Sequence, residues 1–146
     1  MNKNAFLWNL VKKILFKFDA ENVHNAVLAL LKTCPNTFWV KPKSYPKLST
    51  RVFGIDFPNP LGLAAGLDKN AECLLAWQSL GFGFVEVGTV TSKPQSGNKK
   101  PRMFRLQEDQ ALLNRLGFNN IGASLVTKRI EKLRAKNQIK IPIGVN

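Results

Sequence analysis

Histidine, cysteine and acidic residues are all scarce in this sequence of 146 residues. The single histidine, His24, excludes a histidine-rich metal site, and Cys34 and Cys73 have no metal-like spacing, so no bound metal is expected. The two cysteines lie in dissimilar contexts, which favours reduced thiols in a cytosolic setting over a disulfide. Nine acidic residues face 22 lysines and arginines, giving a net charge of +13. This charge indicates either a solvated basic face or affinity for an anionic surface such as lipid or nucleic acid.

Long apolar runs are absent as well. Lys12, Lys13 and Lys17 interrupt the apolar residues near the N-terminus, so we expect neither a signal peptide nor a segment long enough to span a bilayer. A peripheral membrane contact stays compatible with this pattern. The length and a hydrophobic content of 45% predict one globular domain with a real core.

Two amphipathic helices are predicted within the first 40 residues. Residues 5–18 repeat apolar side chains every three or four positions, and Asp19 is a plausible N-cap for a second helix that ends near Cys34. Basic residues on one side of this helical hairpin and Trp, Phe and Leu on the other are typical of an interfacial helix. A hairpin packed onto its own domain fits the pattern equally well. We therefore divide the chain into a helical region over 1–40, a linker over 41–50 and a β/α region over 51–146.

The β/α region begins with a small hairpin, predicted from the alternation of residues 51–57 around a glycine. Strands are expected at about 61–65, 84–89 and 142–146, with helices over about 70–80 and from about 120 to 133 between them. Such a β-α-β succession predicts parallel strands joined by right-handed crossovers. Residues 90–115 form an insertion that contains a short extended run over 103–106.

Small or polar residues follow each of the three predicted strands. They are Ala65 and Gly66 after the first strand, Thr89 after the second and Asn146 at the end of the third. Ligands of parallel β/α folds lie at the carboxyl ends of the strands, so this recurrence favours one shared site. Lys69 follows the first strand closely enough to neutralise an anion held there. A phosphate-binding or dinucleotide-binding loop is disfavoured, because no glycine-rich loop of either standard spacing is present.

The loop over residues 114–120 is the other dense group of polar residues. Its asparagines offer donors and acceptors together, which suits a ring that bears amide or imide groups. An ordinary start of a helix, rich in Asn and Gly and capped by Asn120, explains the same residues.

Four segments together resemble the class 2 dihydroorotate dehydrogenases, which are membrane-associated, FMN-dependent enzymes of pyrimidine synthesis. The segments are NPLGLAAGLDK over 59–69, GFGFVEVGTVT over 81–91, PRMFRL over 101–106 and NRLGFN over 114–119. The resemblance extends to the helical hairpin and so covers essentially the whole chain. It implies an α/β fold in which the hairpin precedes the first three strands of a parallel (β/α)8 TIM barrel, and oxidation of dihydroorotate to orotate with ubiquinone as acceptor.

The resemblance also implies roles for individual residues. The FMN contacts would be Ala65, Gly66, Leu67, Asp68, Lys69, Thr89 and Asn146. The substrate contacts would be Lys69, Asn114, Arg115, Leu116, Gly117 and Phe118. His24 and Arg105 would lie along the route of the quinone, although a structural role suits His24 as well. The family's catalytic serine would lie beyond Asn146, so we expect an N-terminal piece of a longer enzyme, inactive alone.

The expected partners are dihydroorotate, orotate and ubiquinone, with peripheral attachment of the first helices to the cytoplasmic side of a bacterial membrane and no nucleic acid. Two alternatives stay open. A soluble class 1 relative that uses fumarate or NAD is disfavoured, because a soluble acceptor needs no membrane-facing helices. A non-enzymatic basic module for anionic lipid or nucleic acid is disfavoured, because the basic residues form no stripe interleaved with aromatics.

Overall fold

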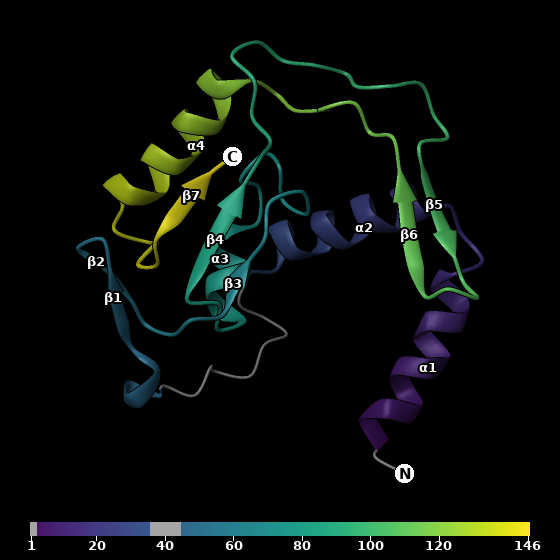
Figure 1. The fold of residues 1–146 in the computed structure, drawn as a ribbon, viewed down its shortest axis with the longest axis horizontal. Coiled ribbons are helices and arrows are strands. Elements are labelled where there is room, and N and C mark those ends of the chain that lie inside the picture. The colour runs from purple at the N-terminus through teal and green to yellow at the C-terminus, as the bar shows by residue number, and fades with distance from the viewer. Residues whose placement is uncertain (1–2, 36–44) are drawn as a thin grey trace.

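A computed structural model describes residues 3–35 and 45–146 (Figure 1). The elements in chain order are α1 (Lys3–Leu15), α2 (Ala20–Thr33), the 3₁₀ helix η1 (Pro46–Leu48), β1 (Thr50–Val52), β2 (Ile55–Phe57), β3 (Gly62–Leu63), α3 (Leu74–Ser79), β4 (Phe84–Val87), β5 (Met103–Leu106), β6 (Ala111–Asn114), α4 (Ala123–Ala135) and β7 (Ile143–Val145). The architecture is an α/β arrangement with N-terminal helices and a small parallel sheet. The predicted boundary at residue 40 and the first part of the linker fall outside the described residues.

The two N-terminal helices meet at a corner and leave it in different directions (Figure 1). α2 begins as predicted, because Asp19 Oδ1 accepts a hydrogen bond of 2.9 Å from the Asn22 amide. α1 ends at Leu15, before the predicted residue 18, where bonds from Lys17 N to Ile14 O and from Phe18 N to Leu15 O tighten the chain into a turn. The two helices therefore diverge from the turn between them and do not pack against each other along their length, as the predicted hairpin would.

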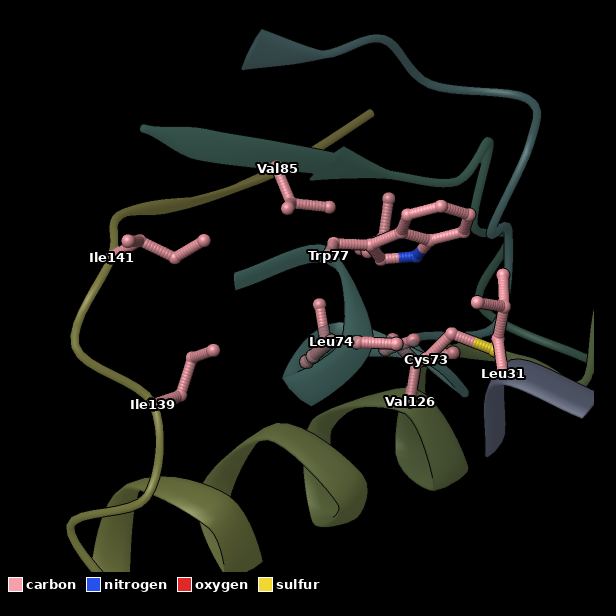
Figure 2. Close-up of a cluster of buried hydrophobic side chains, with 11 residues drawn as sticks. Leu31, Cys73, Leu74, Trp77, Val85, Val126, Ile139 and Ile141 are labelled. Carbon is pink, nitrogen blue, oxygen red and sulfur yellow. The ribbon is translucent and has the colours of Figure 1, made fainter. Parts of the chain in front are cut away.

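The central sheet has the parallel topology that the β-α-β pattern predicts. Its strand order is β3-β4-β7, with Gly62 paired to Phe84 and Val85 paired to Ile143. The core lies between this sheet and the helices: Leu74 and Trp77 of α3, Val126 of α4 and Leu31 of α2 gather beneath Val85 (Figure 2). Burial of this cluster fixes the position of the strands, and hence of the loops that follow them.

The predicted starts of two further helices were wrong for local reasons. α3 starts at Leu74 and not near Asn70, because the Asp68 carboxylate accepts hydrogen bonds of 2.8 Å from the amides of Glu72 and Cys73 and so offers that backbone an alternative to a helix. α4 starts at Ala123, after a turn in which Asn120 Oδ1 accepts a 2.8 Å bond from the Gly122 amide. Asn120 therefore holds the turn before the helix and does not cap it.

The predicted insertion contains an antiparallel hairpin. The short extended run over 103–106 is β5, as expected, and it pairs with β6, in the register Met103 to Asn114 and Leu106 to Ala111. The sequence analysis missed β6, all four residues of which are exposed. The predicted hairpin over residues 51–57 is present as β1 and β2.

Candidate active site

The carboxyl ends of β3, β4 and β7 open onto one cavity of about 480 Å³, called here the strand-end cavity. The loop after β6 closes another side of it. The lining residues are Ala65, Gly66, Lys69, Thr89, Asn98, Asn114, Arg115, Leu116, Gly117, Phe118 and Asn146. The structure thus brings together the three strand ends and the asparagine loop that the sequence analysis singled out, while their roles stay predictions.

Glycines let the strand ends approach one another closely. The Gly66 amide donates to the Gly88 carbonyl over 2.9 Å, and the Val90 amide donates to the Asn146 carbonyl over 2.8 Å. A Cβ atom added to Gly88, where φ is +109°, would lie 2.5 Å from the Asn146 oxygen. A Cβ atom added to Gly66, in contrast, would meet no atom within 4 Å. The backbone at Gly66 therefore presents a bare surface to the cavity.

Lys69 supplies a cation to the strand-end cavity. Its Nζ donates a hydrogen bond of 2.8 Å to Asn119 Oδ1, and no other described residue accepts from it. Partial burial lowers the pKa of Lys69, and the positive charge of Arg102 lowers that pKa further. An anion in the cavity would offset both effects, because it would favour the charged ammonium group.

A short chain of hydrogen bonds orients the amide of Asn146. Thr89 Oγ1 donates to Asn146 Oδ1 over 2.5 Å, while Asn146 Nδ2 faces Glu86 Oε1 at 3.4 Å. The amide oxygen of Asn146 thus already accepts a hydrogen bond from Thr89, whereas its amide nitrogen makes only the long contact to Glu86 among the described residues. A planar ligand with an acceptor group would compete well for that nitrogen.

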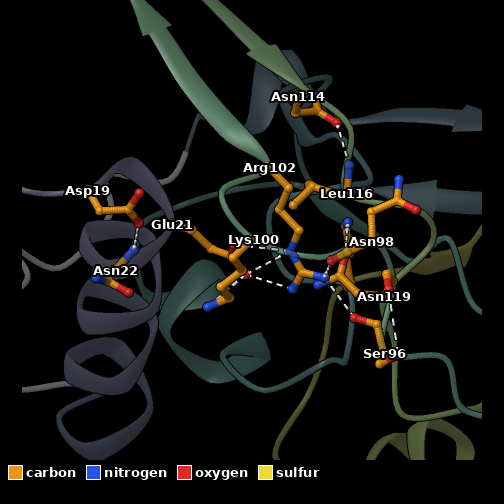
Figure 3. Close-up of polar contacts among 12 residues, drawn as sticks. Asp19, Glu21, Asn22, Ser96, Asn98, Lys100, Arg102, Asn114, Leu116 and Asn119 are labelled. Carbon is orange, nitrogen blue, oxygen red and sulfur yellow. Dashed lines mark hydrogen bonds and ion pairs between the residues drawn. The ribbon is translucent and has the colours of Figure 1, made fainter.

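The loop over residues 114–118 is held through its backbone (Figure 3). Asn98 Nδ2 donates to the Arg115 carbonyl over 2.7 Å, and the Asn98 amide donates to the Leu116 carbonyl over 3.0 Å. A Cβ atom added to Gly117 would lie 2.8 Å from atoms of Asn98, so the two loops fit closely. Among the residues that the structure describes, the side chain of Asn114 makes only one long bond, of 3.5 Å, from the Leu116 amide. The backbone is therefore fixed while the Asn114 amide is left for a ligand.

The dihydroorotate dehydrogenase family model matches residues 47–146, which is most of the chain. The chain belongs to the dihydroorotate dehydrogenase family. It is 49% identical over 144 residues to a dihydroorotate dehydrogenase (quinone) of Idiomarina loihiensis, covering 96% of this chain and 42% of that protein. It is 47% identical over 146 residues to the corresponding protein of Thermus thermophilus, covering 92% and 40%. The chain thus spans about 40% of the length of these curated relatives.

Solved structures agree with this family membership. A crystal structure of DHODH from Eimeria tenella, in complex with ferulenol, superposes with a TM-score of 0.77 at 44% identity. The match covers 88% of this chain and 35% of that one. Ligand-free DHODH from the same organism gives a TM-score of 0.76. The α/β fold of this chain therefore resembles one part of the DHODH structure.

A buried ion pair that sequence reasoning missed ties α2 to the loops of this family member (Figure 3). Arg102 donates from Nη2 to Glu21 Oε1 over 2.7 Å and from Nε to Glu21 Oε2 over 3.0 Å. Its Nη1 donates to the carbonyls of Ser96 and Asn98 over 2.7 and 2.9 Å. The hydrogen bond from Arg102 holds the pKa of Glu21 below its usual value, and Glu21 raises the pKa of Arg102 in turn. No sequence signal joins residues that lie 81 positions apart.

Asp68 lies in the family segment after β3, but its side chain has a structural task. The carboxylate is fully buried and also accepts a 3.0 Å bond from Trp77 Nε1, in addition to the two amides of the α3 turn. Leu67 and Asp68 line a second cavity, of about 260 Å³, and not the strand-end cavity. Gly66 and Lys69 line both cavities. The predicted cofactor contacts of Leu67 and Asp68 therefore do not fall on the cavity where the other predicted contacts lie.

His24 and Arg105 lie in different places. His24 lines the second cavity with Lys69, where burial lowers the pKa of its imidazole and the Lys69 charge lowers it further. Arg105 donates from Nη1 to the Phe18 carbonyl over 2.7 Å and lies 4.7 Å from the centre of the Phe16 ring. It faces a third cavity, beside α1. Across residues 3–35 and 45–146, no helix combines the length and the apolarity needed to cross a membrane.

Proposed function

We propose that this chain is part of a quinone-dependent dihydroorotate dehydrogenase, which oxidises dihydroorotate to orotate in pyrimidine synthesis with FMN as cofactor and ubiquinone as acceptor. The observation that carries the proposal is the strand-end cavity, where a lysine, two asparagines and a threonine from three strand ends and one loop converge. The same proposal makes β3, β4 and β7 the first three strands of a (β/α)8 barrel. Their parallel order, with α3 and α4 in the connections, supports it.

The residues present fit a flavin. The bare backbone at Gly66 and the small side chain of Ala65 leave room for a flat ring, and the polar groups of Lys69, Thr89 and Asn146 stand around the same cavity. FMN, when bound, supplies the hydride acceptor of the reaction. The task of Lys69 in this proposal is to keep positive charge beside that acceptor.

The substrate also fits the same groups. Dihydroorotate carries a carboxylate and an imide, and both need partners of defined polarity. Lys69 would hold the carboxylate, because no other described residue than Asn119 accepts from its ammonium group. The amide of Asn114 makes only one long hydrogen bond and would pair with the imide, which has one donor between two acceptors. An amide that pairs with the imide also discriminates against rings that lack those groups.

The proton acceptor of the reaction stays the serine that the family resemblance implies, and it is not among the residues of this chain. The described side chains that line the strand-end cavity include no carboxylate, imidazole or thiol. His24 and Arg105 stay proposed for the quinone route, with the condition that the route passes the two separate cavities that they line.

The test uses the full-length protein that contains this chain. It should purify with FMN, and dihydroorotate should bleach the flavin absorbance without oxygen. A ubiquinone analogue should then restore the absorbance faster than fumarate or NAD does. A full-length protein without flavin, or with a flavin that dihydroorotate does not bleach, would refute the proposal. Faster reoxidation by fumarate or NAD would favour the class 1 alternative.

A further inference from the structure

Among the residues that the structure describes, Lys69 forms no ion pair, although three carboxylates line a cavity with it. The second cavity, of about 260 Å³, is lined by Lys69 and by the acidic side chains of Glu21, Asp68 and Glu72. None of these carboxylates pairs with the ammonium group, and neither does any other acidic residue in the described part of the chain. Cations that are partly withdrawn from water are usually paired, so the absence of a pair at Lys69 needs an explanation.

Each of the three carboxylates already has other partners. Cations of other segments lie 2.7 to 3.3 Å from two of them, and these pairs are Glu21 with Arg102 and Lys100, and Glu72 with Lys32 and Arg129. The third carboxylate, of Asp68, is fully buried and accepts hydrogen bonds from Trp77 Nε1 and from two backbone amides. The acidic groups of the second cavity are therefore satisfied without Lys69, and the protein leaves its charge unpaired.

A neutral side chain holds the ammonium group instead. Lys69 Nζ donates over 2.8 Å to Asn119 Oδ1, which lies 50 positions later in the chain. Asn119 lines the second cavity and not the strand-end cavity, whereas Lys69 lines both. An ammonium group has three N–H donors. The amide of Asn119 takes one of them and leaves two for a ligand of the strand-end cavity.

The position of Asn119 is itself fixed by its neighbours (Figure 3). A Cβ atom added to Gly97 would lie 2.9 Å from the Cβ atom of Asn119, so the two loops are in close contact there. The next residue, Asn120, is buried, and its amide and carbonyl bond to the carbonyl and amide of Gln95 over 3.0 and 2.9 Å. The acceptor for Lys69 is therefore held in place before any ligand binds, and it restricts the rotamers of the lysine.

A neutral acceptor suits a lysine that binds an anion. A carboxylate at position 119 would also orient the ammonium group, but it would neutralise the charge and compete with the carboxylate of a ligand. An apolar side chain would leave the charge free, but the lysine would lose its order, and ligand binding would then have to restore that order. The amide avoids both losses, because it orients the ammonium group without neutralising it.

We propose that Asn119 is a positioning residue for Lys69, whose neutral amide orients the ammonium group and leaves the positive charge free for the carboxylate of the substrate. This inference rests on the proposed function and adds to it a residue that does not line the strand-end cavity. Asn119 is not among the substrate contacts expected from the sequence. It acts on the substrate only through Lys69.

The experiment measures orotate binding to the full-length flavoprotein by calorimetry. Asn119→Ala should weaken binding by about fivefold, because ligand binding must then order Lys69. Asn119→Asp keeps the shape of the side chain and an acceptor oxygen. It should nevertheless weaken binding by about tenfold to a hundredfold, approaching the loss in Lys69→Met, because the new carboxylate neutralises the ammonium group. If the hydrogen bond alone mattered, Asn119→Asp would bind orotate as the unchanged protein does.

A double-mutant cycle separates positioning from structural damage. In the Lys69→Met background, Asn119→Ala should change the affinity for orotate by less than about twofold, because no ammonium group is left to be held. A structural defect caused by Asn119→Ala would instead weaken binding equally in both backgrounds.

The matched control is Asn70→Asp, which adds the same charge at the residue next to Lys69 in sequence. Asn70 Oδ1 accepts a 3.1 Å bond from the Ile121 amide, and a carboxylate can accept that bond as well. Asn70 also lines the second cavity and not the strand-end cavity. Asn70→Asp should weaken orotate binding by less than about threefold, because a charge that does not bond directly to the ammonium group is screened.

Three results would overturn the inference. Asn119→Asp could bind orotate as tightly as the unchanged protein does. The loss in Asn119→Ala could persist in the Lys69→Met background. Asn119→Asp and Asn70→Asp could weaken binding equally, which would mean a general effect of charge. The thermal midpoint reports whether each variant folds. If Asn119→Ala does not fold, the comparison of Asn119→Asp with Asn70→Asp decides, because both changes keep the shape of the side chain.

Failure of this inference can be told apart from failure of the proposed function. If dihydroorotate bleaches the flavin of the unchanged protein but the Asn119 variants bind orotate as well as that protein does, only the positioning role is refuted. If the unchanged full-length protein shows no bleaching and binds no orotate, the proposed function is refuted and the inference falls with it.

Discussion

Replacing the buried pair of Glu21 and Arg102 tests how firmly α2 is joined to the loops around the strand-end cavity. Both side chains are 8% exposed and share three hydrogen bonds. Arg102→Met would leave the Glu21 carboxylate with only Lys100, whose Nζ lies 3.3 Å away. It would also remove the donors to the carbonyls of Ser96 and Asn98. Breaking a buried pair from one side costs about 3–5 kcal/mol of unfolding free energy.

The double variant Glu21→Met, Arg102→Met should cost less than the two single changes added together. Replacing both charges with apolar groups leaves no carboxylate or guanidinium buried alone. We expect the loss of unfolding free energy in the double variant to be smaller than the sum of the two single losses by at least about 2 kcal/mol. Urea unfolding followed by circular dichroism measures these losses. The matched control is the pair of Arg51 and Asp56, at 3.6 Å and 69% and 75% exposed, where each change should cost at most about 1 kcal/mol.

The pH dependence gives an independent check. Because the folded protein holds the pKa of Glu21 below its usual 4.5, the pair contributes its full stability above that value. The contribution is lost as the pH falls from there through the lower pKa of the folded state. Glu21→Gln should therefore flatten the fall in unfolding free energy below about pH 4.5 and change nothing in its slope near neutrality. Additive single changes, or an unchanged acid slope in Glu21→Gln, would refute the reasoning.

Three further outcomes can be checked. Lys69→Met in the full-length protein should weaken orotate binding by about tenfold to a hundredfold in calorimetry, because a charged hydrogen bond is lost, while Lys69→Arg should recover part of it. Gly88→Ala should lower the thermal midpoint more than Gly54→Ala: both glycines have positive φ, but only the Cβ atom added at position 88 would lie 2.5 Å from a carbonyl oxygen; equal shifts would contradict this. A thiol reagent at neutral pH should modify Cys34 and spare Cys73, because burial above all, and then Asp68, raise the pKa of the Cys73 thiol to about 12; labelling that survives in Cys34→Ser would contradict it.

The parallel sheet, and the edge at which its strands end together, could be predicted from the sequence. Apolar runs of strand length between helical patterns define β3, β4 and β7, and parallel strands must present their carboxyl ends together. For this reason the approach of Ala65, Thr89 and Asn146 followed from topology alone. The start of α3 did not, because the carboxylate of Asp68 competes for backbone amides in a way that periodicity does not register.

Contacts between distant segments were beyond sequence reasoning. Glu21 reads as an ordinary acidic residue in the first turn of a helix, yet it is buried against Arg102. Asp68 lies within a segment that was predicted to contact the cofactor, yet its side chain turns inward to Trp77. β6 was hidden because its four residues are all exposed and show no alternation. Only Glu21 meets a partner from a distant part of the chain; Asp68 and β6 meet partners nearby in sequence that periodicity does not reveal.

Lys69 lines both the strand-end cavity and the cavity that contains His24, and this makes ligand binding measurable at His24. Lys69 faces the strand-end cavity on one side and the cavity of His24 on the other, and its charge helps to lower the pKa of that imidazole. An anion bound beside Lys69 would offset this charge, so the pKa of His24 should rise when such an anion binds. His24 is the only histidine within the 146 residues. In this chain a single imidazole resonance therefore reports whether an anion occupies the strand-end cavity, although His24 itself lines the other cavity.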